Sequence, residues 1–113
     1  NSDFTLADLA HSRMPRARLA RCVFQRANLE AADLRDADLS GSDFAGSKLV
    51  DARMDGACLE GADLRNANLT GVRGLTCDAL MRARTDNLTV LPNGKRGPYI
   101  RRSGAEHPVL SGI

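Results

Sequence analysis

The side chains that could do chemistry in this chain are its carboxylates, its two histidines and its three cysteines. A catalytic carboxylate pair needs a pocket and shifted pKa values, whereas the aspartates here recur at even spacing beside leucines, as by-products of a repeat. His11 and His107 lie far apart without a partner pattern, and we expect both on the surface. No serine or cysteine stands in a nucleophile motif. The sequence therefore predicts that the chain is not an enzyme and takes no small-molecule substrate.

The cysteines, Cys22, Cys58 and Cys77, are odd in number and include no CxxC pair. This count argues against a disulfide framework and against a zinc site. We expect no metal, no cofactor, and a reducing compartment, the cytoplasm. The chain also contains no apolar stretch of about 20 residues, so we expect no membrane span.

The arginines form the other distinctive group. A net charge of +2 is too mild to indicate nucleic-acid binding by itself, and no aromatic residues are interleaved for base stacking. One interpretation is a surface for an anionic or protein partner, formed by Arg13, Arg16, Arg18, Arg21, Arg26, Arg101 and Arg102. The alternative for the first five is an ordinary solvated face, balanced by Asp33, Asp36 and Asp38.

A period of five residues decides where all these side chains lie. Large apolar residues recur at every fifth position. An α-helix would distribute these residues around its surface, and a flat strand would place successive ones on opposite faces. A chain that turns a corner every five residues keeps the series inside, together with the small residue two positions earlier. The predicted core is Phe4, Leu9, Met14, Leu19, Phe24, Leu29, Leu34, Leu39, Phe44, Leu49, Met54, Leu59, Leu64 and Leu69.

Four such sides close a square coil of twenty residues, with coils stacked ~4.8 Å apart. We infer an all-β solenoid, a right-handed quadrilateral β-helix of about three and a half coils with a short helical cap. Phe4, Phe24 and Phe44 share one position in successive coils and predict an aromatic ladder. In the same register, Arg13, Asp33 and Arg53 fall on one outer column. Outer charges that are neighbours in a column are predicted to pair across coils, as in Arg18–Asp38, Arg16–Asp36 and Arg35–Asp55.

The motif A(D/N)LXX, seen as ADLAH, ANLEA, ADLRD, ADLSG, ADLRN and ANLTG, resembles the pentapeptide-repeat proteins over residues 2–73. The resemblance implies the β-helix just inferred and a bacterial, non-catalytic protein. Some members of that family bind DNA gyrase by mimicking duplex DNA with an acidic rod, usually as dimers. Residues 1–72 hold eleven acidic and nine basic side chains, and this mixed charge weighs against mimicry. The outward positions that depart from the usual Asp or Asn are Arg13, Arg18, Val23, Lys48, Arg53 and Cys58.

The repeat ends after residue 73, and we expect residues 74–94 to form a C-terminal cap that also resembles the family's. Thr76 is the predicted N-cap of a helix over residues 77–84. Leu75, Leu80 and Met81 are expected to cover the last coil. Residues 95–113 are expected to form an irregular basic tail, which either lies on the cap, moves freely or docks a partner.

Ser2 already begins a repeat, so the first coil of residues 1–73 is expected to be open, and an open β-edge invites pairing. A missing upstream domain is the preferred interpretation, and a homodimer is the alternative. The predicted function is a protein–protein interaction or scaffold module of a larger chain or assembly, with nucleic acid disfavoured. The alternative is a gyrase-binding DNA mimic.

Overall fold

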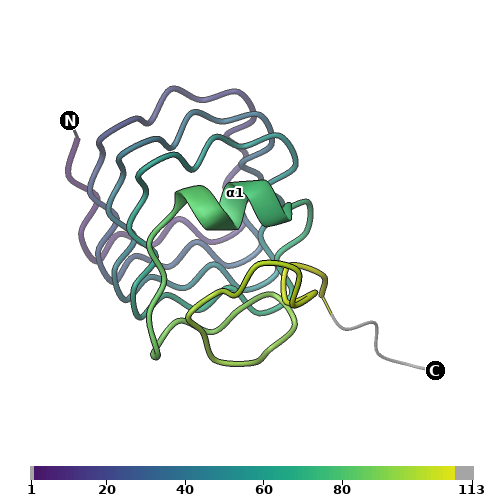
Figure 1. Cartoon of the computed structure of the whole chain (residues 1–113). Coiled ribbons are helices and arrows are strands. Elements are labelled where there is room, and N and C mark those ends of the chain that lie inside the picture. The colour runs from purple at the N-terminus through teal and green to yellow at the C-terminus, as the bar shows by residue number, and fades with distance from the viewer. Residues whose placement is uncertain (1, 109–113) are drawn as a thin grey trace.

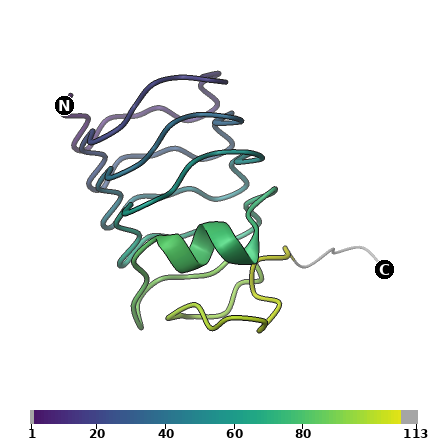
Figure 2. The ribbon, with the colours of Figure 1, turned by 45° about the horizontal axis from the view of Figure 1, so that its top comes forward.

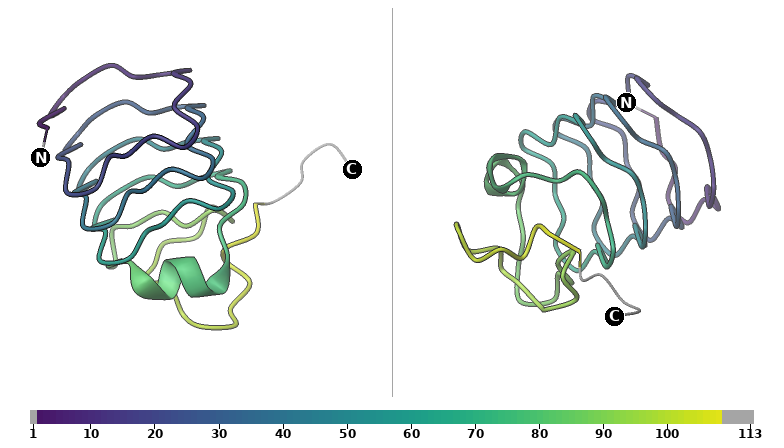
Figure 3. Two further views of the ribbon diagram at one scale, coloured as in Figure 1. Left: turned by 90° about the horizontal axis from the view of Figure 1, so that it is seen from above. Right: turned by 90° about the vertical axis from the view of Figure 1, so that its right-hand side faces the viewer.

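The computed structural model describes residues 2–108, which wind into a stack of four-sided coils (Figure 1). The N-terminal coil lies at one end of the stack, and the helix α1 (Cys77–Arg82) lies near the other end (Figure 2). Parallel β-bridges join residues twenty apart, from Asp3↔Val23 to Arg53↔Arg73. Seen from two further directions, each coil lies directly over the next (Figure 3). The predicted register of twenty residues is therefore confirmed.

Each side of a coil is too short to form a continuous strand, and within residues 2–108 the pairing consists of isolated bridges. The N–H of Phe24 donates to the carbonyl of Asp43 in the next coil at 2.7 Å, and the N–H of Ala27 closes the corner onto the Phe24 carbonyl at 3.1 Å. Such a corner needs a residue with positive φ, which is Arg26 here (φ 56°). The corners interrupt the ladder every five residues and fix the direction of every outward side chain.

The interior is filled by the large apolar series. The Phe4 and Phe24 rings stack with centroids 5.0 Å apart, and those of Phe24 and Phe44 are 4.8 Å apart, which confirms the predicted ladder. Four members of the series are only half-buried, because among residues 2–108 their coil is packed against another coil on one side only: Phe4, Leu9, Met14 and Leu19. The fully buried members are Phe24, Leu29, Leu34, Leu39, Phe44, Leu49, Met54, Leu59, Leu64 and Leu69.

The helix α1 spans Cys77–Arg82, two residues shorter than the predicted 77–84. Thr76 is its N-cap, and its side chain accepts a hydrogen bond from the N–H of Ala79 at 3.1 Å. The helix is short because its one buried residue, Leu80, leaves little apolar surface to hold a longer one. None of the helices in residues 2–108 has the length and apolarity needed to cross a bilayer.

The packing of the cap differs from the prediction at one residue. Leu75 and Leu80 are buried as expected, but Met81 is 49% exposed. The prediction for Met81 is wrong because neighbouring residues on a helix point about 100° apart, so only one of two successive side chains faces the coil. The exposed Met81 belongs to the outer surface of the cap.

Residues 83–108 continue the stack and then fold back over it. Parallel bridges at Arg84 and Val90 extend the ladder, and Val90 pairs antiparallel with Arg96. The buried Tyr99 anchors the following segment, because its N–H donates to Thr85 Oγ1 at 2.9 Å. Its hydroxyl donates to a carboxylate oxygen of Glu106 at 2.8 Å. The segment up to residue 108 is thus held against the cap, and residues 109–113 lie outside the described part.

Candidate functional site

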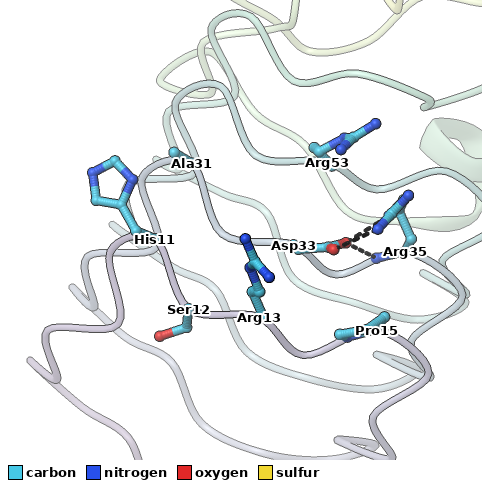
Figure 4. Close-up of a pocket in the computed structure, with 8 residues that line it drawn as sticks. All are labelled: His11, Ser12, Arg13, Pro15, Ala31, Asp33, Arg35 and Arg53. Atoms are coloured by element: carbon cyan, nitrogen blue, oxygen red, sulfur yellow. Dashed lines mark hydrogen bonds and ion pairs between the residues drawn. The ribbon is translucent and has the colours of Figure 1, made fainter.

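One side of the rod carries an open groove of about 590 Å³, drawn in Figure 4. Its residues come from three successive coils, because side chains twenty residues apart lie next to each other. They are His11, Ser12, Arg13, Pro15, Ala31, Asp33, Arg35 and Arg53.

The centre of the groove is an ion pair within one coil. The side chain of Arg35 donates to both carboxylate oxygens of Asp33, at 2.9 and 2.8 Å, and the Arg35 backbone N–H adds a third bond at 3.2 Å. These hydrogen bonds lower the pKa of Asp33 from 3.8 to about 2. The carboxylate is therefore ionised and its charge is already compensated by Arg35.

Arg13 and Arg53 flank this pair from the coils on either side of Asp33. Neither guanidinium makes an ion pair with any residue from 2 to 108. They stand two coil spacings apart, ~10 Å between backbones. Because Arg35 already compensates Asp33, the two flanking arginines leave the groove with free positive charge, suited to carboxylate or phosphate groups.

The ion pairs of the rod differ from the predicted ones. The predicted inter-coil pairs Arg18–Asp38, Arg16–Asp36 and Arg35–Asp55 do not form among residues 2–108, where the rod's own pairs are Asp33–Arg35 and Asp63–Arg65. The reason is local. For two of the three pairs, a bond within one coil competes: Asp38 accepts the backbone N–H of Ser40 at 3.1 Å, and the side chain of Arg35 donates to Asp33 at 2.9 Å.

The predicted arginine run does not form a single patch. Only Arg13 lines the groove. Arg16, Arg21 and Arg26 occupy three different corners, each with positive φ, and Arg18 lies on the next side of the coil. Arg101 and Arg102 belong to the exposed segment after the cap helix.

Sequence reasoning placed Arg13, Asp33 and Arg53 in one outer column, and the bridges confirm that column, but it did not recognise a groove there. It also assigned Arg35 to Asp55 in the next coil and so missed the position of Arg35 beside Asp33. The twenty-residue register was the signal for the column, whereas the bond between Arg35 and Asp33 lies within one coil.

A second titratable cluster lies at the cap. The Tyr99 hydroxyl lowers the pKa of Cys77 by hydrogen bonding, while burial raises the pKa of Tyr99. Cys22 is buried in the rod and Cys58 is exposed. Within residues 2–108 there is no group of three or more His, Cys, Asp or Glu side chains that could hold a metal ion.

The Asp33–Arg35 pair predicts an acid-dependent loss of stability. Because the pKa of Asp33 is lower when folded than its ordinary 3.8, the pair stabilises the fold above that pH and loses its contribution as pH falls towards about 2. Asp33→Asn should lower the free energy of unfolding at neutral pH and flatten its decline below pH 3.8. Urea unfolding over a pH series measures this. The same pH dependence of the free energy of unfolding in the variant and in the wild type would contradict it.

Four-sided coils, inward stacks of large apolar residues and corners every five residues define a β-solenoid whose outer side chains form a fixed lattice. A family model described as "Pentapeptide repeats (8 copies)" matches the chain twice, over residues 2–41 and over residues 32–71. The chain belongs to the pentapeptide-repeat family. The family's fold is the right-handed β-helix that the sequence predicts.

Solved structures of this family resemble the chain. The pentapeptide repeat protein Rfr23 from the cyanobacterium Cyanothece 51142 has 34% identity and a TM-score of 0.65, over 73% of this chain and 55% of that one. The chain thus spans about half of that relative's length. The pentapeptide repeat protein alr5209 from Nostoc PCC 7120 has 25% identity and a TM-score of 0.65, over 94% of this chain and 83% of that one. The plasmid-mediated fluoroquinolone resistance protein QnrB1 has 25% identity and a TM-score of 0.38, over 62% of this chain and 47% of that one. No curated protein sequence gives a significant match.

Proposed function

We propose that the chain is a non-catalytic docking module that binds a protein partner through the groove around Arg13 and Arg53. The observation that carries the proposal is the position of Arg13 and Arg53, which make no ion pair among residues 2–108 and lie on the coils above and below the compensated Asp33–Arg35 pair. Arginine is a common anchor of protein interfaces. A rigid lattice loses little conformational entropy on binding, which favours recognition of a matched partner.

The remaining architecture is consistent with a scaffold. We take residues 1–73 as about three and a half coils, residues 74–94 as the cap and residues 95–113 as the basic segment. Within residues 2–108, the interior of the rod is filled and the groove is open, so neither offers an enclosed cavity for a substrate. A reducing compartment such as the cytoplasm suits cysteines that form no disulfide within residues 2–108, of which Cys58 is exposed.

The gyrase-binding alternative depends on surface charge. A DNA mimic needs rows of acidic side chains, whereas the column that starts at Arg13 reads Arg, Asp, Arg, Arg along the rod. The charge of residues 1–72 is nearly balanced, with eleven acidic and nine basic side chains. The groove therefore favours a partner that brings negative charge over a partner that binds DNA.

Charge reversal in the groove tests the proposal. A tagged Arg13→Glu/Arg53→Glu variant should recover its partner at least about tenfold less well than wild type in quantitative pull-downs from source cells, as expected for two interface arginines. Cross-linking with mass spectrometry identifies the partner and the contact site.

The matched control is Arg21→Glu/Arg26→Glu, which makes the same charge change at exposed corners outside the groove. This control should keep the partner. Equal losses in both variants would show a general charge effect and contradict the groove. Recovery of gyrase subunits by the wild type would instead support the alternative function.

A further inference from the structure

Charge is distributed unevenly along the molecule. Residues 1–72 hold nine basic and eleven acidic side chains, whereas residues 73–113 hold seven basic and three acidic ones. The cap end is therefore positive and the rod slightly negative. Figure 2 shows that the residues after α1 lie at the end of the stack remote from the N-terminal coil.

Four cations of this end have no ion partner among the described residues. Lys95, Arg96, Arg101 and Arg102 are exposed, and none makes an ion pair with any residue from 2 to 108. We call these four cations, together with Ile100, the cap surface.

The three carboxylates of residues 73–108 are all engaged elsewhere. Asp78 binds Arg82 at 2.9 Å, and Glu106 accepts from Tyr99 and pairs with His107. The third carboxylate, Asp86, accepts backbone N–H groups, including that of Leu88 at 3.0 Å. None of these three carboxylates therefore neutralises the four cations of the cap surface.

The cap surface is presented by a fixed turn. The buried Tyr99 anchors one side of it through its bonds to Thr85 and Glu106. The N–H of Ser103 then donates to the carbonyl of Ile100 at 3.1 Å, with Arg102 at a φ of 65°. This turn holds Ile100, Arg101 and Arg102 at the outside, while the residue before them points inwards.

Aliphatic side chains lie among the cations. Ile100 is 67% exposed and lines a groove with Lys95 and Arg96. Met81 is 49% exposed and lines a neighbouring groove with Arg101. Three of the four large hydrophobic side chains that are exposed in residues 2–108 belong to residues 73–108, the third being Leu88.

We propose that the cap surface binds the anionic surface of a phospholipid bilayer, with Ile100 entering the headgroup region and the rod pointing away. Clustered Lys and Arg are attracted to anionic headgroups, and an exposed aliphatic side chain gains from leaving water there. A nucleic acid would leave Ile100 and Met81 without a partner, and the buried Tyr99 offers no ring for base stacking. The proposal does not depend on the docking groove, which lies on the rod.

Sedimentation with vesicles tests the proposal on the whole chain. The protein should sediment with vesicles of phosphatidylcholine and phosphatidylglycerol, and not with phosphatidylcholine alone. Added salt should release it. Arg101→Gln/Arg102→Gln should lower the partition coefficient about fivefold for each arginine removed. Ile100→Ser should lower it up to about tenfold, and its thermal unfolding should stay as in wild type because the side chain is exposed.

The matched control is Arg16→Gln/Arg21→Gln, which removes the same charge at exposed corners of the first coil, where φ is also positive. This control and the groove variant Arg13→Glu/Arg53→Glu should bind vesicles like wild type. Equal binding to both vesicle types, no binding to either, or an equal loss in the control would overturn the proposal. Tighter binding of a duplex oligonucleotide, lost in the cap variants, would also overturn it in favour of a nucleic-acid surface.

Discussion

Phe24→Ala should lower the free energy of unfolding by about 3–5 kcal/mol, the usual cost of deleting a fully buried phenylalanine. Phe24 is 1% exposed and its ring stacks on Phe4 on one side and on Phe44 on the other. Because the backbone on both sides is held by bridges between coils, the coils cannot collapse into the space that the ring leaves. Urea unfolding followed by circular dichroism measures the change.

The control for this experiment is Leu6→Ala, also in the N-terminal part of the rod. Leu6 is 68% exposed at a corner, and its replacement should change the free energy of unfolding by no more than about 0.5 kcal/mol. A loss below about 1 kcal/mol for Phe24→Ala would show that the ring is not part of a packed ladder. Because coils interact with their nearest neighbours, the denaturant slope also shows whether the stack still unfolds as one unit.

The register of the fold could be predicted because every repeat has the same pattern of one large and one small apolar or small polar residue. A large residue and a small one, two apart, are compatible with burial only when the chain turns every five residues, and fourteen consecutive repeats leave one consistent arrangement. Phe4, Phe24 and Phe44 then had to stack, as they do. The N-cap at Thr76 was also predictable, because its hydroxyl acceptor stands directly before the helix.

The side-chain pairing of the rod could not be predicted from the register alone. The register brings Arg18 next to Asp38, but Asp38 bonds to the backbone N–H and hydroxyl of Ser40 instead. A bond within one coil needs no adjustment between coils and is formed as soon as the corner turns. Within the described residues 2–108, this competition leaves Arg13 and Arg53 without ion partners, and it produces the groove that a search for local arginine runs missed.

The segment after the cap was unpredictable for a different reason. Residues 95–108 have no periodicity, and their conformation depends on contacts between distant residues. Tyr99 is buried only because Thr85 and Glu106 satisfy its polar groups. Met81 was misplaced for the same kind of reason, since which of two neighbouring helix residues faces the coil depends on how the helix is seated.

The largest effect outside the core is expected where the last coil passes into the cap. Gly74 has a φ of 87°, and a Cβ at this position would lie 2.6 Å from the Cα of Asp55 and collide with the Asp55 carboxylate. Since the obstacle includes backbone, the chain before α1 would have to move. Gly74→Ala should therefore lower the free energy of unfolding by more than about 3 kcal/mol, beyond the 1–2 kcal/mol of left-handed strain alone.

Gly94→Ala separates the two contributions. Gly94 has nearly the same φ, 86°, but a Cβ there would meet nothing within 4 Å. It should therefore cost only the left-handed strain, about 1–2 kcal/mol. Equal losses in the two variants, measured by urea unfolding, would mean that the cap adjusts freely around Asp55. A larger loss at Gly74, with exposed Leu75 and Leu80 detected by binding of a hydrophobic dye, would show that the cap is seated through the close approach of these two backbones.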